Sequence, residues 1–399
     1  MSTSTIETKK GMGTSIAPSN KLENADGKAF ILFGIDWLKL QSFITTCLQM
    51  PITKDDFTAR YGSFSDESLI DDCIAAMKQI QALGTEMGSP TTLRHNIEKN
   101  PNYLSGDTPP KSVFAHCAWM AGRLSMHATT YNGNLGALKN FITNSPKENK
   151  KVLADIMSPT GGLQATAKRA LSEIVALQNA LSTFEANFVA AQKGIKKYVD
   201  SESKVIAAAK AAENVDTTTI ASLQGKATAA HKAWENYTIG ATTSSIGIAV
   251  ISLGLLAPLG AVAGGVLGHL AVEELDAYNG FMKKIGNEQK ALSQKTRLVL
   301  DLTSFDSMLS EVSSQLSKFK TDLYTIQGVW LSQNTQITAI TKLPFSKIGS
   351  YSEIVQAIHL TVALKEWNAI ATNTSEFITD SLVSYNDSVQ YPAQYPTSS

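Results

Sequence analysis

Two long runs of the sequence place apolar residues at alternating spacings of four and three, and this pattern constrains the fold most. The first run begins at Leu163 and reaches Tyr198, and small residues extend it to Ala212. The second run begins at Leu298 and ends at Trp330. Heptads sustained this long are typical of coiled coils, because an ordinary surface helix loses the phase sooner. We therefore expect a first helix about 75 Å long, at 1.5 Å per residue.

An apolar segment without Asp, Glu, Lys or Arg, 237–272, lies between the two runs. Pro258 divides it, and because helices usually end before a proline, this position predicts the turn of a helical hairpin. The first arm, Thr238–Ala257, would be about 30 Å long, close to the thickness of a bilayer core. The second arm, Leu259–Val272, would be about 21 Å long and falls short of it. The residues predicted to enter a membrane are Ile246, Ile248, Val250, Ile251, Leu253, Leu255, Leu256, Pro258, Leu259, Val262, Val266 and Leu267.

Glycines mark one helix face in each arm of this hairpin. They are Gly240, Gly247 and Gly254, at every seventh position, and Gly260, Gly264 and Gly268, at every fourth. A glycine in a water-exposed helix costs about 1 kcal/mol relative to alanine. Close packing of helices in lipid relies on small residues, so we expect these glycines to form packing faces there.

The hairpin has two other interpretations, a buried core element and a permanent two-pass membrane anchor. A core helix prefers leucine and isoleucine to this glycine-rich composition, and a thin bundle has little interior. The flanks carry no Lys/Arg bias, which argues against a permanent anchor. We therefore expect a soluble chain that covers the hairpin and later inserts it. His269 either lies at the interface or acts as a proton switch that favours insertion when neutral.

The remaining sequence predicts shorter helices and no convincing strand. These helices are Asp36–Met50, one after Ser65 that ends at Gly84 or Gly88, 111–142, and Ser352 to about Asp387. The stretch Pro90–Pro110 is expected to be irregular, and Pro146 and 158–162 are expected to break the chain. We predict an all-α fold, an elongated helical bundle with two very long antiparallel coiled-coil helices and a hydrophobic hairpin at the tip. The predicted ranges are 1–30 flexible tail, 31–158 N-terminal helices, 159–236 first long helix, 237–272 hairpin, 273–345 second long helix, and 346–399 C-terminal helix and tail.

Composition and motifs exclude several classes of function. Lys plus Arg and Asp plus Glu are both 35, so the chain lacks the basic surface of a nucleic-acid binder. Cys47, Cys73 and Cys117 form no CxxC pair, and they are too few for a disulfide framework. No histidines lie at metal-ligand spacing, and no GxSxG, P-loop or GxGxxG motif is present. We predict no metal, no cofactor and no enzymatic activity. The N-terminal residues also lack the apolar run of a secretory signal.

A chain without such a signal, in which two long amphipathic helices flank a hydrophobic hairpin, resembles the α-helical pore-forming toxins of the cytolysin A type. It looks most like the A subunit of the binary xenorhabdolysin-type cytotoxins. The segment 50–64, MPITKDDFTARYGSF, is similar to that family's N-terminal stretch, and 329–340, VWLSQNTQITAI, to a stretch late in its second long helix. The hairpin is longer than expected for the binary A subunit, which leaves a component of a tripartite relative open.

This resemblance implies a secreted soluble monomer, exported without a classical signal peptide, that changes conformation at the lipid membrane of a target cell. It further implies that the protein oligomerises there with a second toxin subunit into a lytic, haemolytic pore. The alternative is a non-enzymatic coiled-coil structural or adaptor protein whose hydrophobic hairpin docks a partner.

The glycine faces give a first testable prediction. Gly264→Ile should push the neighbouring helix away in lipid, so we expect normal folding and membrane binding, with pore formation reduced by about tenfold or more. Val266→Ile, a change on another face of the helix, serves as the control. Vesicle leakage measures both, and full lytic activity of Gly264→Ile would leave the glycine spacing without a functional meaning.

Overall fold

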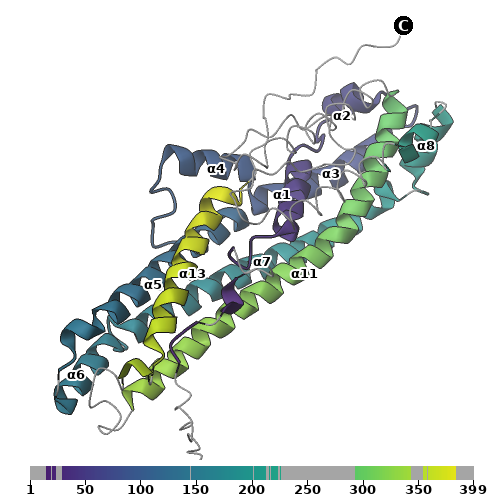
Figure 1. Ribbon diagram of the computed structural model, residues 1–399. Coiled ribbons are helices and arrows are strands. Elements are labelled where there is room, and N and C mark those ends of the chain that lie inside the picture. Colours follow the sequence, from purple (N-terminus) through teal and green to yellow (C-terminus); the bar gives the residue numbers. More distant parts are fainter. Residues whose placement is uncertain are drawn as a thin grey trace, which may run out of the picture. The chain divides into compact units, whose positions relative to one another are not determined.

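The computed structural model describes residues 15–18, 20–23, 29–143, 145–200, 202–212, 215, 217–222, 225, 293–342, 354–356 and 358–382. Its elements are the 3-10 helix η1 (Asn20–Leu22) and the helices α1 (Ile35–Leu48), α2 (Lys54–Tyr61), α3 (Glu67–Met87), α4 (Pro90–Lys99), α5 (Val113–Phe141), α6 (Pro146–Ile156), α7 (Leu163–Val199), α8 (Lys204–Ala212), α11 (Gln294–Thr341) and α13 (Leu360–Asp380). Within these ranges the one β contact is an isolated bridge between Glu23 and Phe30. The predicted all-α fold is confirmed (Figure 1).

The chain divides into two compact units, and α5, α7, α11 and α13 each contribute residues to both. Unit 1 comprises Met1–Ile31, Met120–Ala176 and Asp322–Ser375, and unit 2 comprises Leu32–Trp119, Leu177–Thr321 and Glu376–Ser399.

The two predicted heptad stripes are buried. Each apolar position of the first run from Leu163 to Tyr198, and of the second from Leu298 to Trp330, is at most 8% exposed. The members of the first are Leu163, Ala167, Ala170, Ile174, Leu177, Leu181, Phe184, Phe188, Ala191, Ile195 and Tyr198, and those of the second are Leu298, Leu302, Phe305, Leu309, Val312, Leu316, Phe319, Leu323, Ile326 and Trp330. The spacing therefore identified the core faces of α7 and α11 correctly.

In unit 2 the two long helices are antiparallel neighbours (Figure 1). Lys320 Nζ donates to Glu185 Oε2 at 2.6 Å, and further along α7 Gln192 Nε2 donates to the Leu309 carbonyl at 3.3 Å. Residue numbers rise along α7 while those of the partners fall along α11, which defines the antiparallel direction.

Aromatic residues of α1 fasten it to the core of unit 2. The Trp37 ring stacks on Phe319 of α11 at 5.5 Å and meets the edge of Phe114 of α5 at 5.0 Å. Its indole Nε1 donates to the Ser381 carbonyl at 3.0 Å. On another side α1 packs against α3, where a Cβ added to Gly84 would lie 3.0 Å from the backbone nitrogen of Leu48. A side chain at this glycine would force the two helices apart.

Unit 1 is built around three large aromatic side chains. Trp330 and Trp367 lie 5.1 Å apart between ring centroids, and Tyr131 lies 4.4 Å from Trp367. Trp367 Nε1 donates to the Ile16 carbonyl at 2.9 Å, and Ile16 itself is fully buried. Trp330 and Trp367 are both fully buried and are core residues of unit 1. The predicted domain ranges, including the flexible tail 1–30, stay predictions.

The first long helix is interrupted, contrary to the prediction of a continuous helix to Ala212. It ends at Val199, and α8 begins at Lys204. Ser203 Oγ donates to the Tyr198 carbonyl at 2.8 Å and accepts from Ile206 N at 3.2 Å. Short polar side chains such as serine can hydrogen-bond to the backbone in place of the helical partners and so interrupt a helix. The apolar spacing does not reveal this interruption, because small residues continue the spacing across it.

Three further expectations about helices were wrong in part. The region Pro90–Pro110 is not wholly irregular, because Ser89 caps α4 by accepting from Thr92 N, with Pro90 in the first turn. Similarly, Pro146 does not break the chain but opens α6, behind the cap Ser145. Finally, α13 begins at Leu360 because the preceding residue, His359, has a φ of 52°, which a right-handed helix does not allow.

All three cysteines are free and buried. Burial raises the pKa of Cys47 well above its ordinary value, and it raises that of Cys73 to about 12. The pKa of Cys117 is raised for the same reason. These thiols therefore pack as small apolar side chains.

The buried heptad stripe of α11, its seam with the neighbouring helices, generates a prediction about stability. Leu316 is fully buried, so Leu316→Asp should lower the free energy of unfolding by about 3–5 kcal/mol through an unpaired buried charge. Ser314, which is exposed on the same helix, provides the control Ser314→Asp. Urea unfolding of both variants measures the difference, and a loss below about 1 kcal/mol for Leu316→Asp would show that the seam is wrongly assigned.

Candidate functional site

The predicted membrane-inserting hairpin lies outside the described residues, as does everything from 226 to 292. This holds for Ile246, Ile248, Val250, Ile251, Leu253, Leu255, Leu256, Pro258, Leu259, Val262, Val266 and Leu267, for the glycines Gly240, Gly247, Gly254, Gly260, Gly264 and Gly268, and for His269. Their roles stay predictions. The described residues resume at 293, directly before the start of α11 at Gln294.

A segment between α1 and α3 holds the first turns of α11 in unit 2. We name this segment, Thr53–Phe64, the strap; it contains α2 and the loop that follows. Lys295 Nζ donates to the carbonyl oxygens of Tyr61 at 2.9 Å and Ser63 at 2.6 Å. The same ammonium lies 3.6 Å from the centroid of the Phe64 ring. Because a buried ammonium needs several partners, this arrangement fixes the strap against the helix.

Two further contacts continue this attachment along α11. Gln294 Nε2 donates to the Ala59 carbonyl at 3.3 Å, and Arg297 Nη1 donates to the Arg60 carbonyl at 3.4 Å. The basic and amide side chains of α11 thus satisfy carbonyl groups at the carboxyl end of α2, which an isolated helix leaves without partners.

Local sequence explains why the strap adopts this shape. Thr53 caps α2, since its Oγ1 accepts from Asp56 N at 3.1 Å and donates to Asp56 Oδ2 at 2.6 Å. At the other end the backbone of Gly62 has a φ of 75°, a conformation that glycine adopts without steric cost. A Cβ added there would lie 2.6 Å from Gln294 Oε1, the end of a side chain that can move aside, so it is the positive φ of the turn that requires glycine.

A buried carboxyl group lies beneath the strap. Asp301 of α11 is 1% exposed, and Tyr61 Oη donates to its Oδ2 at 2.9 Å. Burial raises the pKa of Asp301 to about 8, against the opposing effects of the Tyr61 hydrogen bond and the charges of Arg60 and Arg297. Burial therefore favours the neutral, protonated form of this carboxyl group.

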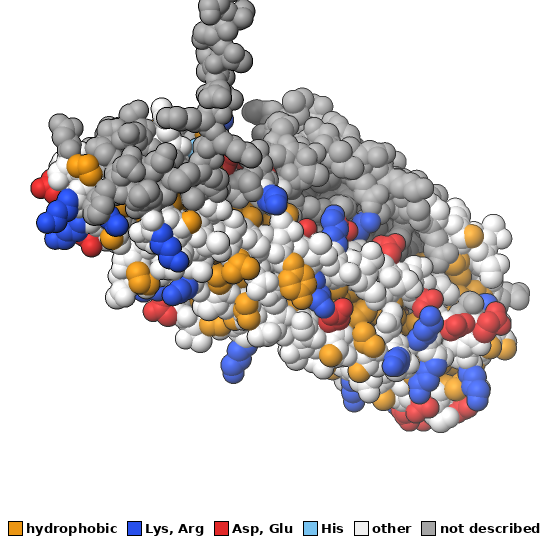
Figure 2. All heavy atoms as spheres, turned by 90° about the horizontal axis from the view of Figure 1, so that it is seen from below, with side chains coloured by type: hydrophobic (Ala, Val, Ile, Leu, Met, Phe, Trp, Pro, Cys, Tyr) orange, Lys and Arg blue, Asp and Glu red, His pale blue; other side chains and the backbone are white. Residues whose placement is uncertain are grey.

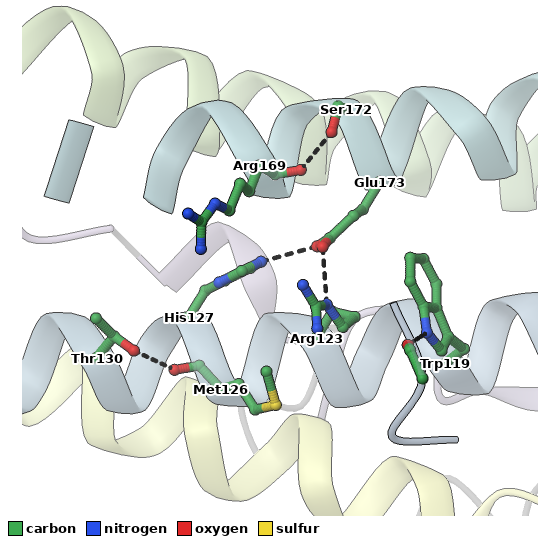
Figure 3. A network of polar contacts seen from close by, with 9 residues as sticks. Trp119, Arg123, Met126, His127, Thr130, Arg169, Ser172 and Glu173 are labelled. Atoms are coloured by element: carbon green, nitrogen blue, oxygen red, sulfur yellow. Dashed lines mark hydrogen bonds and ion pairs between the residues drawn. The ribbon is translucent and has the colours of Figure 1, made fainter. Parts of the chain in front are cut away.

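A second polar cluster lies in unit 1, between α5 and α7 (Figure 3). Glu173 accepts a hydrogen bond of 2.8 Å from Arg123 Nε and contacts His127 Nε2 at 2.8 Å. Because an ionised carboxylate can only accept, Nε2 must carry the hydrogen here. Burial opposes the charge of Glu173, but the hydrogen bonds and charges of His127 and Arg123 outweigh it and lower the pKa of Glu173.

This cluster contains groups used in acid–base catalysis, but its surroundings suit a structural ion pair. Glu173 and His127 are only 8% and 5% exposed, and the His127 ring packs edge-on against Trp330 at 5.9 Å. A buried pair of this kind specifies how helices meet, because removing one partner leaves a charge buried alone.

In the described part of the chain, no three His, Cys, Asp or Glu side chains lie close enough together to form a metal site. Among the described helices, none combines the length and apolar composition needed to cross a bilayer. On the face drawn in Figure 2, basic and acidic side chains are interspersed. This agrees with the equal numbers of both in the sequence.

Comparison with known proteins identifies the fold. No protein-family model and no curated protein sequence matches this chain. Among solved structures, the HblL1 toxin component of Bacillus cereus aligns with a TM-score of 0.58 and 16% identity, over 92% of this chain and 98% of that one. Soluble SmhA, from the tripartite α-pore-forming toxin Smh of Serratia marcescens, aligns with a TM-score of 0.51 and 13% identity, over 92% and 96%. The chain has the fold of α-helical pore-forming toxin components.

This finding confirms the predicted resemblance at the level of the fold. The SmhA structure comes from a tripartite toxin, whereas the assignment to the A subunit of a binary toxin is a prediction that no comparison tests. The sequence singles out the segment 50–64, which includes the strap, by its resemblance alone, and it gives no indication of the contacts between the strap and α11. The spacing of Thr53 and Asp56 could have indicated the start of α2, but no local signal links Tyr61 to Asp301.

The Glu173 cluster generates a prediction about acid stability. Since the folded-state pKa of Glu173 lies below its unfolded value of about 4.3, its charge stabilises the fold above that pH and is lost as the pH falls through the folded pKa. Glu173→Gln should therefore cost about 1–3 kcal/mol at pH 7 and lose less stability on acidification. The control Asp155→Asn changes an exposed carboxylate of the same unit. Equal urea-unfolding profiles of both variants from pH 3 to 7 would contradict this role.

Proposed function

We propose that the protein is the soluble component of a pore-forming cytotoxin. In this proposal it changes conformation at the target membrane, inserts or docks the glycine-rich hairpin 237–272, and oligomerises into a lytic pore, with a second toxin subunit as partner. The observation that carries the proposal is the likeness in fold to a toxin component, over 92% of this chain and 98% of that one. These steps are conformational change, membrane insertion and assembly, and none of them needs a catalytic group.

The sequence between α8 and α11 supports the membrane part of the proposal. The hairpin segment lacks Asp, Glu, Lys and Arg, and the net charge of the chain is zero. Binding to lipid would therefore depend on apolar burial, with little contribution from attraction to anionic headgroups. Burying roughly 2,000 Å² of apolar surface in lipid would release at most about 50 kcal/mol. A small part of this exceeds the stability of a typical bundle, about 5–15 kcal/mol.

The partner belongs to the proposal because SmhA is one part of a tripartite toxin. The second arm of the predicted hairpin is too short to cross a bilayer core. In this proposal the second subunit supplies the remaining part of the membrane-spanning structure. Export without a classical signal peptide, and a monomer that becomes membrane-associated only on the target cell, complete the proposed sequence of events.

A site-specific fluorophore tests insertion. An environment-sensitive dye on a cysteine at Val250 or Ile251 should shift its emission to the blue when target-cell membranes are added, because the residue passes from water or protein into lipid. The same dye at Ser314, which is exposed on α11, is the control and should not enter lipid. Identical behaviour of the two sites would refute insertion by the hairpin.

Leakage of a dye from loaded vesicles separates a pore-forming component from an adaptor. A toxin component, alone or with its partner subunit, should release the dye. An adaptor whose hairpin docks another protein should leave the vesicles intact.

A further inference from the structure

The strap occupies a position from which it can control the start of α11. This helix begins directly after the segment 226–292 in sequence, and its first described residues are held by strap contacts through Gln294, Lys295 and Arg297. A further contact, the hydrogen bond between Tyr61 and Asp301, is also buried. Any movement of the first two turns of α11 away from α2 must break it.

The environment of Asp301 suits a neutral carboxyl group. Its Oδ2 accepts from Tyr61, whereas Oδ1 has no hydrogen-bond partner in the described structure. An ionised carboxylate would therefore keep one oxygen buried and unsatisfied, at a large cost in free energy. A protonated carboxyl still accepts from Tyr61 through Oδ2 and carries its hydrogen on Oδ1, and a neutral hydroxyl without a partner costs much less to bury than a charge.

Among the described residues, the charged and titratable groups that act on Asp301 are Tyr61 and Arg60 of α2 and Arg297 of α11. The charges of the two guanidinium groups favour the ionised form of Asp301. Arg60 Nη1 donates to the Gln49 carbonyl at 3.3 Å, and Arg297 Nη1 donates to the Arg60 carbonyl. Both thus direct a donor to a backbone carbonyl, and burial outweighs their charges.

We propose that the strap is a pH-dependent clasp, which closes over the start of α11 while Asp301 is protonated and opens when Asp301 ionises. The direction of the pH dependence follows from the linkage between closure of the strap and proton binding by Asp301. The carboxyl binds its proton more tightly in the closed state, so the stability of closure is full below the open-state pKa, about 3.9, and is lost as the pH rises toward about 8. Opening would free the end of α11 that follows the hairpin 237–272 in the sequence, after the residues 273–292. That consequence, but not the clasp itself, rests on the proposed function.

Hydrogen exchange of the full-length protein at pH 6 and pH 9 tests the clasp, after correction for the intrinsic pH dependence of exchange. We expect opening at α2 and at the first two turns of α11 to increase by about tenfold or more between the two values. The middle of α11, around the buried Leu316, should stay protected at both, because the change is local.

Asp301→Asn provides the matched test, since the amide keeps an acceptor for Tyr61 and cannot ionise. This variant should retain at pH 9 the protection seen at pH 6, whereas Asp306→Asn, a change to a half-buried carboxylate on the same helix, should behave like the wild type. If Asp301→Asn does not fold, the wild-type comparison alone decides.

Two outcomes would overturn the clasp. One is unchanged wild-type protection of the strap between pH 6 and pH 9, and the other is equal loss of protection throughout the protein. A pH-dependent strap in a protein that never releases dye from vesicles would instead refute the proposed function and leave the clasp standing.

Discussion

Burial of two heptad stripes is the constraint on which the rest of this structure depends. The stripes of α7 and α11 remove large aliphatic and aromatic side chains from water, and burial of such area is the dominant favourable term in folding. The shorter helices add to this core through individual aromatic residues. In unit 2 this residue is Trp37 of α1, and in unit 1 it is Trp367 of α13.

The long helices could be predicted from the sequence because their signal is periodic and repeated, so that single exceptions do not hide it. Helix boundaries depend on single polar side chains and could not be predicted in the same way. Ser203 ends one helical run and begins the next, and Ser89 starts a helix in a stretch rich in breakers. The turn at His359 is set by a backbone angle that the residue type does not dictate. At these points local hydrogen bonding overrides an apolar pattern.

The candidate site likewise has one part that the sequence predicts and another that it does not. The hairpin is a local feature of composition, so the sequence alone proposes it, although its residues lie outside the described structure. The attachment of the strap joins residues 240 positions apart, and no periodicity reports such a contact. The fold itself tolerates divergence. A seam requires apolar side chains of suitable size at set positions, which is compatible with 16% identity over 92% of the chain.

The burial of the three cysteines has a practical consequence for chemistry on this molecule. A thiol reacts through its thiolate, and Cys47, Cys73 and Cys117 are both inaccessible and raised in pKa. In the folded protein an alkylating reagent should therefore ignore all three and modify a thiol introduced at the surface. The native cysteines therefore need not be removed before site-specific labelling. If they became reactive, this would indicate that the bundle had unfolded.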